Sequence, residues 1–304
     1  MQKAKIGLNK KELKKYGFVL AVFAYPAILF CIFYIGINFN SILLAFQKLD
    51  IAGNKTFYGF ENFKTFIQNL QGNGMVGLSL KNSLLIYAVN LAICMPLYLL
   101  FAFYLFKKFF GSGVFRVIVM IPSIVSTFII CLLFKKFVET ALPSVFQALG
   151  VKNFPMLLSD ERYTLGTMIF YMIWISFSTS LIVYPNAMNS VDPGIYESAQ
   201  VEGVTLFQEF WHIVLPLIYP TISTFLITGI AGIFTTEGPL ISFYMYSAPP
   251  ETFTFGYWMT TKVMTANNNL EYPYLAAGGI LVTLVSAPLT YLVKYLLDKF
   301  DPTL

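Results

Sequence analysis

The sequence predicts an all-α integral membrane protein with six transmembrane helices, and three observations lead to this fold class. Apolar residues make up 57% of the 304 residues and charged residues only 12%, roughly half the charged share of soluble domains. Six stretches without a charged residue are long enough to cross a bilayer as helices. A cluster of lysines directly precedes the first stretch. A soluble domain is excluded because so few charges cannot cover its surface, and disorder is excluded because it requires low hydrophobicity.

The six expected spans follow one another along the whole chain. They cover about residues 18–37, 83–106, 114–134, 165–184, 213–236 and 272–293. Prolines recur within or near these spans, at Pro26, Pro96, Pro122, Pro216, Pro220 and Pro288. Neighbouring helices can satisfy the carbonyl groups that a proline leaves free, so this pattern favours a packed bundle over isolated anchors. The apolar segment 238–250 is too short to span and is expected to form a surface or re-entrant segment.

The N-terminal arm, residues 1–16, predicts the orientation. It carries six lysines, namely Lys3, Lys5, Lys10, Lys11, Lys14 and Lys15. Positive charge beside the first span favours a cytoplasmic N-terminus, and six spans then return the C-terminus to the same side. A cleaved signal peptide would have a shorter apolar region, followed by a cleavage site of small residues. The stretch 18–37 is longer than such a region, and no cleavage site of this kind follows it. The expected organisation is therefore a basic cytoplasmic arm followed by one membrane domain, residues 17–304.

Two connecting segments have helical patterns of their own. On the outer side, Phe60, Phe63, Phe66 and Ile67 have the spacing of one helical face, so a short amphipathic helix is expected there. On the inner side, residues 186–212 contain four acidic residues and no lysine or arginine, which is unusual for a cytoplasmic loop.

The inner loop contains signals for two short helices. Asp192 and Pro193 are a typical cap and first residue of a helix. Gly203 is a typical left-handed end. Thr205 and Gln208 then have the spacing of a capping box that starts a second helix. A connector needs only a few residues, so this compact acidic pair of helices indicates a surface that another protein binds.

The same loop carries a motif of seven residues. Glu197, Ser198, Ala199, Gly203, Ile213, Leu215 and Pro216 follow the pattern Glu-Ala-Ala-x3-Gly-x9-Ile-x-Leu-Pro, with Ser198 in place of an alanine. This resembles the cytoplasmic signature of ABC-importer permeases. Residues Gly59 to Phe63 and the surroundings of the motif are similar to the carbohydrate-uptake branch, the maltose-type and glycerol-phosphate-type permeases. The resemblance is loosest at 237–269, where Glu237-Gly238-Pro239 replaces a frequent Gly-Gly-Pro turn.

The resemblance implies a type I importer permease bundle in the cytoplasmic membrane of a prokaryote. Residues 186–212 would form a coupling-helix loop that docks on cytoplasmic ATP-binding subunits. The other implied partners are a second permease, in a heterodimer, and an extracytoplasmic solute-binding protein. The implied function is import of a sugar or oligosaccharide. The chain has no Gly-x4-Gly-Lys-Ser/Thr loop, so ATP hydrolysis is expected in a partner and this chain is not expected to be an enzyme.

The alternative function is that of a secondary transporter, or of another polytopic membrane protein without an ATPase partner. It is disfavoured because the spans contain no central carboxylate for proton or ion coupling. Tyr171, Trp174 and Ser178 share one helical face of the fourth span and are the candidate substrate-pathway residues. Packing between helices is the competing role for each. A single histidine, His212, argues against a metal site. We expect no cofactor and no nucleic-acid partner, and we expect membrane lipid to surround the spans.

Overall fold

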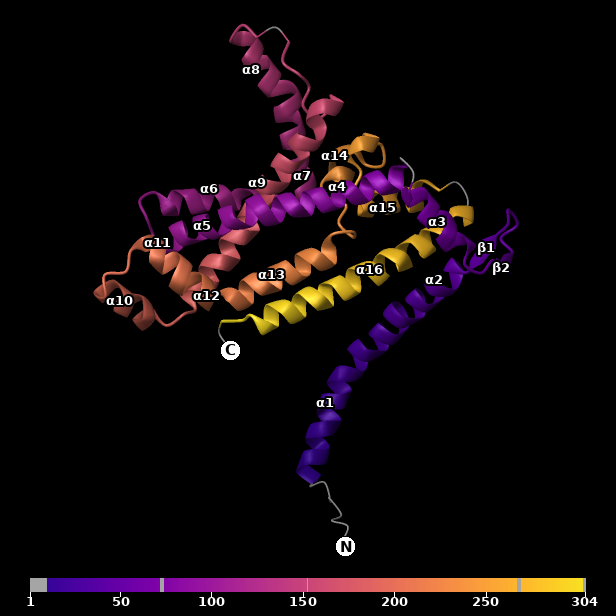
Figure 1. The fold of residues 1–304 in the computed structure, drawn as a ribbon, viewed down its shortest axis with the longest axis horizontal. Helices are drawn as coiled ribbons and strands as arrows, with labels where there is room; N and C mark the ends of the chain where they lie inside the picture. The colour runs from indigo at the N-terminus through magenta and orange to yellow at the C-terminus, as the bar shows by residue number, and fades with distance from the viewer. Residues whose placement is uncertain (1–9, 72–73, 152, 267–268, 303–304) are drawn as a thin grey trace. The chain divides into compact units, whose positions relative to one another are not determined.

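The computed structural model describes residues 10–71, 74–151, 153–266 and 269–302, and the chain divides into two compact units (Figure 1). Unit 1 comprises residues 1–66 and 267–280, and unit 2 comprises residues 67–266 and 281–304. Helices dominate both units, as the sequence predicts.

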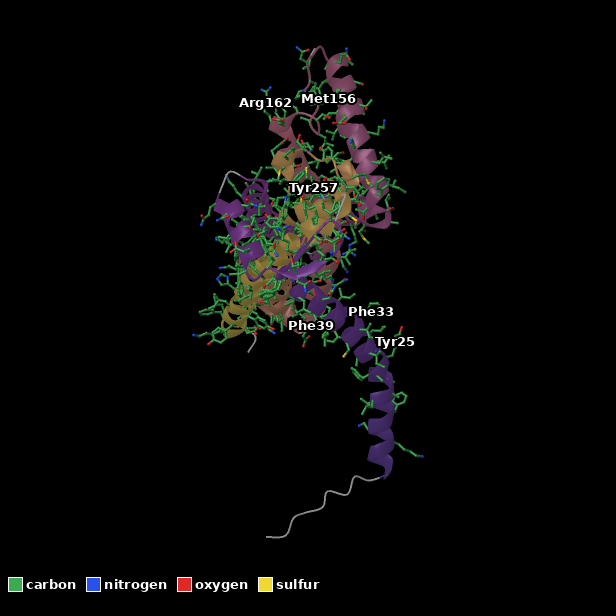
Figure 2. The ribbon with its side chains drawn as sticks, turned by 90° about the vertical axis from the view of Figure 1, so that its right-hand side faces the viewer. Tyr25, Phe33, Phe39, Met156, Arg162 and Tyr257 are labelled. Carbon is green, nitrogen blue, oxygen red and sulfur yellow. The ribbon has the colours of Figure 1, made fainter. Side chains whose placement is uncertain are left out.

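Unit 1 contains the first spanning helix, residues Gly17–Ala45. It is built from α1 (Lys10–Leu29), the π-helical η1 (Phe30–Gly36) and α2 (Ile37–Ala45). Within the unit its apolar side chains are uncovered; Figure 2 shows Tyr25, Phe33 and Phe39 projecting from it, and these side chains are 71%, 61% and 60% exposed. A helix that is apolar on every side suits hydrocarbon surroundings.

A short β-hairpin follows this helix, and the all-α prediction missed it. Strands β1 (Gln47–Leu49) and β2 (Lys55–Phe57) pair antiparallel. In the turn, the Asp50 carboxylate accepts hydrogen bonds from the Asn54 side chain at 2.8 Å and the Asn54 backbone at 2.7 Å, which hold the pKa of Asp50 below its ordinary value. Strands of three residues are too short to show a period of two in the sequence.

The expected amphipathic helix is α3, and only part of its expected apolar face is buried. Phe66 and Phe63 are 0% and 8% exposed, whereas Phe60 and Ile67 are 72% and 43% exposed. Phe60 departs from the expectation because the helix begins after it. A Cβ atom on Gly278 would collide with the Phe66 ring, so a glycine permits this packing. Phe63 and Phe66 lie on α3 (Glu61–Gln71). Gly278 lies on α16 (Tyr272–Lys299), which directly follows η6 (Asn269–Glu271).

Unit 2 contains two long spanning helices that pack against each other. The first, Met75–Phe106, consists of α4 (Met75–Val89), the π-helical η2 (Asn90–Cys94) and α5 (Met95–Phe106). The second is α9 (Glu161–Asn189), which lies along α5. The expected spans 83–106 and 165–184 lie inside these two helices.

The expected third span, 114–134, is not one straight helix. Helix α6 (Ser112–Ile124) ends at Val125, whose backbone is extended, and the chain turns by 106° into the next helical run. That run comprises α7 (Thr127–Lys136), η3 (Phe137–Ala141) and α8 (Leu142–Ala148), so helix continues beyond the expected end. Hydropathy measures the length of an apolar stretch and not its direction, which is why the bend was missed.

The expected fifth span, 213–236, is also bent, by 67° near Ile218. Before the bend lie α11 (Leu206–Glu209), η4 (Phe210–Val214) and α12 (Leu215–Leu217), and after it lies α13 (Tyr219–Gly232). Pro216 and Pro220 flank the bend and lack the amide donors that would continue a straight helix. Within the described residues, four helices are long and apolar enough to span, and counting each bent pair as one further span gives six candidates, the number the sequence predicts.

The apolar segment 238–250, expected as a surface or re-entrant segment, is folded and partly buried. It contains α14 (Leu240–Tyr244), and it is followed by η5 (Pro250–Thr252), which begins at its last residue, and by α15 (Phe255–Thr265). The Asn82 amide donates hydrogen bonds to the backbone carbonyls of Glu251 and Phe253 at 2.7 and 3.0 Å, and the Ser83 hydroxyl accepts one from the Phe255 amide. In Figure 1, α14 and α15 lie at the opposite end of unit 2 from α10 (Pro193–Val201) and α11.

Candidate functional site

The loop 186–212 folds into the two capped helices that its sequence predicts. The Asp192 carboxylate accepts a hydrogen bond from the Gly194 amide at 2.9 Å, and α10 begins at Pro193. Gly203 has φ +77 and ends the helix. The Gly203 amide donates to the Gln200 carbonyl and the Val204 amide to the Ala199 carbonyl, both at 3.1 Å, which is the Schellman arrangement.

The second helix, α11, begins with the expected capping box. The Gln208 side chain accepts a hydrogen bond from the Thr205 amide at 3.0 Å, and the Thr205 hydroxyl caps the Gln208 amide. These caps define both ends of the turn between the helices, so the turn presents one backbone shape to its surroundings.

An apolar cluster joins this loop to the spans of unit 2, and we call it the anchoring cluster. Tyr196 of α10 and Phe210 of η4 are 7% and 5% exposed within it. The Tyr196 hydroxyl donates to the Met188 carbonyl at 3.1 Å, at the end of α9. Burial raises the pKa of the Tyr196 phenol, and the nearby Glu209 carboxylate raises it further. The cluster consists of Cys94, Tyr98, Leu99, Ala102, Phe103, Leu105, Leu181, Tyr184, Met188, Tyr196, Phe210, Val214, Ile218 and Ile222.

The seven motif residues divide into three sets by their exposure. Glu197, Ser198 and Gly203 are exposed, and a Cβ on Gly203 would meet no atom of the chain within 4 Å. Ala199 is 6% exposed and belongs to the inner face of α10, so it does not share the outward side with Glu197. The remaining three are half-buried and lie in η4 and α12, just after the loop: Ile213, Leu215 and Pro216.

The outward side of the loop is apolar as well as acidic. Val201, Phe207 and Trp211 are 89%, 71% and 51% exposed. Exposed apolar side chains that gather on one surface mark a site of contact with another protein or a membrane. Asp192, Glu197 and Glu202 are exposed acidic residues of the same loop.

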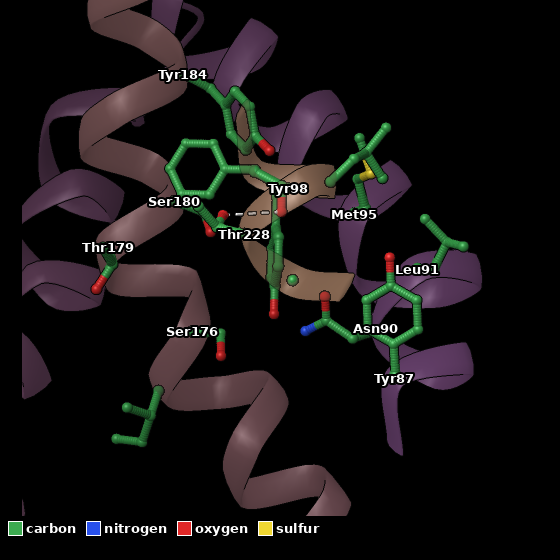
Figure 3. Close-up of a pocket in the computed structure, with 14 residues that line it drawn as sticks. Tyr87, Asn90, Leu91, Met95, Tyr98, Ser176, Thr179, Ser180, Tyr184 and Thr228 are labelled. Atoms are coloured by element: carbon green, nitrogen blue, oxygen red, sulfur yellow. Dashed lines mark hydrogen bonds between the residues drawn. The ribbon is translucent and has the colours of Figure 1, made fainter. Parts of the chain in front are cut away.

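A second site lies between α4, η2, α5, α9 and α13, where a cavity of about 440 Å³ opens (Figure 3). Figure 3 shows the Tyr98 hydroxyl, the Asn90 amide and the Ser176 hydroxyl around one space. None of the fourteen described residues that line the cavity is charged. The lining combines hydroxyl and amide groups with aromatic rings, and its polar members are Tyr87, Asn90, Tyr98, Ser176, Thr179, Ser180, Tyr184 and Thr228.

Two features of the cavity favour a polar ligand. The Tyr87 hydroxyl is buried and has no hydrogen-bond partner among the described residues, which is unfavourable by about 1–3 kcal/mol unless water or a ligand binds it. Asn90 begins the π-helical turn η2, and such turns often occur at functional sites. The described part of the chain shows no group of three or more His, Cys, Asp or Glu side chains that could hold a metal ion.

The three predicted pathway residues lie elsewhere on α9. Tyr171 and Ser178 are 2% and 1% exposed, and the Tyr171 ring packs against Phe134 with centroids 4.9 Å apart. Trp174 lines a separate apolar cleft of about 320 Å³ with Ile130, Leu133, Phe134, Phe137 and Phe170. The polar cavity is instead reached from α9 by Ser176, Thr179 and Ser180.

Residues 88–304, more than half of the chain, match the family described as binding-protein-dependent transport system inner membrane component. The chain belongs to this family. The permease is also similar to the multiple sugar-binding transport system permease protein MsmF of Streptococcus mutans, with 23% identity over 96% of this chain and 99% of that protein. The polygalacturonan/rhamnogalacturonan transport system permease protein YteP of Bacillus subtilis is 27% identical over 98% of this chain and 92% of that protein.

Solved structures have the same fold as the permease. A chain of a bacterial ABC transporter involved in import of the acidic polysaccharide alginate superposes with a TM-score of 0.81 at 22% identity, covering 95% of this chain and 98% of that one. A chain of an alginate transporter in complex with a pentasaccharide-bound periplasmic protein superposes with a TM-score of 0.75 at 20% identity, covering 93% and 94%. These likenesses confirm the importer permease fold.

Sequence reasoning missed the cavity residues of the permease that lie outside α9. Tyr87, Asn90 and Tyr98 lie on α4, η2 and α5, and Thr228 lies on α13. Asn90 is the one with a sequence signal, since an amide within a long apolar stretch is unfavourable in hydrocarbon without a polar neighbour.

We expect cysteine labelling to distinguish the two faces of α9. With the three native cysteines replaced by alanine, Ser176→Cys should react with a water-soluble maleimide at least about tenfold faster than Ser178→Cys, because only an accessible thiolate reacts. Ser178 is the matched control, since it lies two residues away on the same helix and is 1% exposed. Equal labelling rates would contradict the placement of the cavity.

Proposed function

We propose that this permease imports an uncharged sugar or oligosaccharide across the cytoplasmic membrane of a prokaryote, driven by ATP that partner subunits hydrolyse. One observation carries the proposal. Tyr98 and Tyr184 belong both to the anchoring cluster and to the lining of the polar cavity. A movement of the cytoplasmic loop therefore has a continuous packed route to the cavity.

The chemistry of the cavity supports a neutral sugar. Hydroxyl and amide groups can exchange hydrogen bonds with sugar hydroxyls, and tyrosine rings offer apolar faces. The described lining has no charge that would bind a carboxylate. Of the relatives, MsmF is named for multiple-sugar transport, whereas YteP is named for transport of polygalacturonan and rhamnogalacturonan, which carry carboxylates. On this proposal, the ligand of this permease is uncharged, unlike the acidic polysaccharide of the alginate transporter.

The proposed partners follow from the loop and from the family. The outward side of the loop, with Glu197 and Gly203 of the motif, would dock on a cytoplasmic ATP-binding subunit. A second permease subunit would complete the pathway, as a heterodimer, and an extracytoplasmic binding protein would deliver the sugar. The exposed acidic and apolar residues of the loop support a protein partner. The permease itself would catalyse no reaction.

We propose the orientation in which both termini are cytoplasmic. The lysines of the N-terminal arm support it. The last turns of α16 lie beside the loop end of α13, where the Tyr219 hydroxyl donates to the Leu297 carbonyl at 3.0 Å. The C-terminal end would therefore share the cytoplasmic side with the loop.

Labelling of intact cells tests this orientation. In the chain without native cysteines, Asn54→Cys should react with an impermeant maleimide, whereas Gln200→Cys should react only after the membrane is opened. Both positions are exposed within the chain, so burial does not account for a difference. The reverse pattern of labelling would refute the orientation.

Variants of the loop test the coupling function. Gly203→Val places a β-branched residue at φ +77, a conformation that asparagine tolerates much better. Glu197→Lys reverses an exposed charge. We expect both variants to insert in the membrane, but solute-stimulated ATP turnover and uptake in reconstituted vesicles should fall close to background.

The matched control for the loop variants is Gly203→Asn, which adds a side chain at the same position with less backbone strain. It should retain more turnover than Gly203→Val. Wild-type turnover and uptake in both Gly203→Val and Glu197→Lys would exclude the loop as the mechanical link and would remove the main support for ATP-driven import.

A pair of isosteric variants tests the cavity. Thr228→Val removes a hydroxyl that lines the cavity, whereas Thr224→Val removes one on the same helix that does not line it. Loss of one hydrogen bond to the sugar should lower uptake by about 2–10-fold. Uptake of a panel of neutral and acidic oligosaccharides measures the effect, and equal uptake by the two variants would exclude the cavity from the pathway.

A further inference from the structure

A buried ion pair joins the end of the second spanning helix to the cytoplasmic loop. The Lys107 ammonium, at the C-cap of α5, lies 2.5 Å from the Glu209 carboxylate, which ends α11. Their side chains are 13% and 3% exposed. The described residues provide no other hydrogen-bond partner for this Glu209 oxygen.

Aromatic rings enclose the lysine side of the pair. The Lys107 nitrogen lies 5.8, 5.7 and 5.9 Å from the ring centroids of Phe103, Phe106 and Tyr196. A cation within about 6 Å of an aromatic face is attracted to it. Two of these rings come from α5 and the third from α10, so the ammonium contacts both the span and the first loop helix while it pairs with the second.

The position of the lysine suits the backbone around it, and the glutamate is next to an apolar contact between the same two segments. Lysine at the C-terminal end of α5 interacts favourably with the negative end of the helix dipole. Glu209 directly precedes Phe210, whose ring packs against Phe103 of α5 with centroids 5.2 Å apart. The ion pair and this apolar contact therefore both join the end of α5 to the helical run of α11 and η4.

Stability alone does not explain such a pair. A buried ion pair can often be replaced by apolar residues of similar volume without loss of stability, because removing two charges from water is costly. An ion pair differs from an apolar contact in being directional, since charge-assisted hydrogen bonds require a defined geometry. The distinctive contribution of this pair is therefore a defined position for α11 relative to α5.

We propose that Lys107 and Glu209 are a positioning pair for energy coupling. They hold the second loop helix to the end of α5, so that a displacement of the loop moves the α4–η2–α5 wall of the cavity with it. The proposal rests on the proposed function. Neither residue contacts the solute cavity or lies on the outward side of the loop.

The test uses the complex of the permease with its second permease, ATP-binding subunits and binding protein in vesicles. It compares solute imported per ATP hydrolysed. In the double variant Lys107→Met with Glu209→Met, the complex should assemble in wild-type amounts because no charge is left unpaired. The ratio should fall about tenfold or more, within the usual range of coupling between two sites.

Two further variants are matched controls. Lys107→Arg keeps the positive charge and a charge-assisted hydrogen bond to the Glu209 carboxylate, so it should hold the ratio within about threefold of wild type. Lys108→Met removes the adjacent lysine, which is exposed, and should leave the ratio unchanged. A change in Lys108→Met as large as in the double variant would show a general effect of positive charge and would overturn the proposal.

Each remaining outcome also decides the proposal. If the double variant has the wild-type ratio of solute imported to ATP hydrolysed, the pair only fills space in the packing and the proposal is wrong. A double variant that fails to assemble would make the pair a structural element and would equally overturn a positioning role. If instead the wild-type complex shows no ATP turnover stimulated by binding protein and sugar, the proposed function is wrong. That result is seen in the wild type, whereas failure of the positioning role is seen only in the variants.

Discussion

The packing of Tyr196 and Phe210 into the anchoring cluster is the interaction on which the functional structure depends. These two side chains come from the loop 186–212, yet they are buried among residues of α5, α9 and α13. Burying an aromatic side chain of this size contributes about 1.5–3 kcal/mol relative to exposure to water. Because these side chains are packed among the spans, a displacement of the loop would also displace the helices that contact them. A loop attached only at its two ends could change its conformation without moving the helices.

Two bends in the spans extend this arrangement. The 67° bend near Ile218 directs the chain from the loop into α13, and Ile218 is itself a buried member of the anchoring cluster. The 106° bend after α6 directs α7 toward α14. Bent helices within a membrane are tolerated where neighbouring protein satisfies the freed backbone groups. Prolines and single extended residues thus shape the bundle while the spans remain helical.

The fourth span illustrates where sequence reasoning stops. Tyr171, Trp174 and Ser178 have the spacing of one helical face, and on that face Tyr171 and Trp174 contact the ring of Phe134. Ser176, only two residues from Ser178, lines the polar cavity instead, because two helical steps of 100° reverse the direction of a side chain. Hydroxyl and aromatic residues occupy both faces, so composition alone could not distinguish the packed face from the face of the cavity.

The sequence by itself determined the class of protein, the number of spans and the local form of the loop. These features depend on local causes: apolar length, the caps at Asp192 and Thr205, and the left-handed turn at Gly203. Only the tertiary structure decided that Ala199 faces inward, that Lys107 pairs with Glu209, and that Tyr87, Asn90 and Thr228 line one cavity. Those facts join residues far apart in the chain, and their geometry is set by how helices rotate and bend when they pack, which a periodic pattern does not encode.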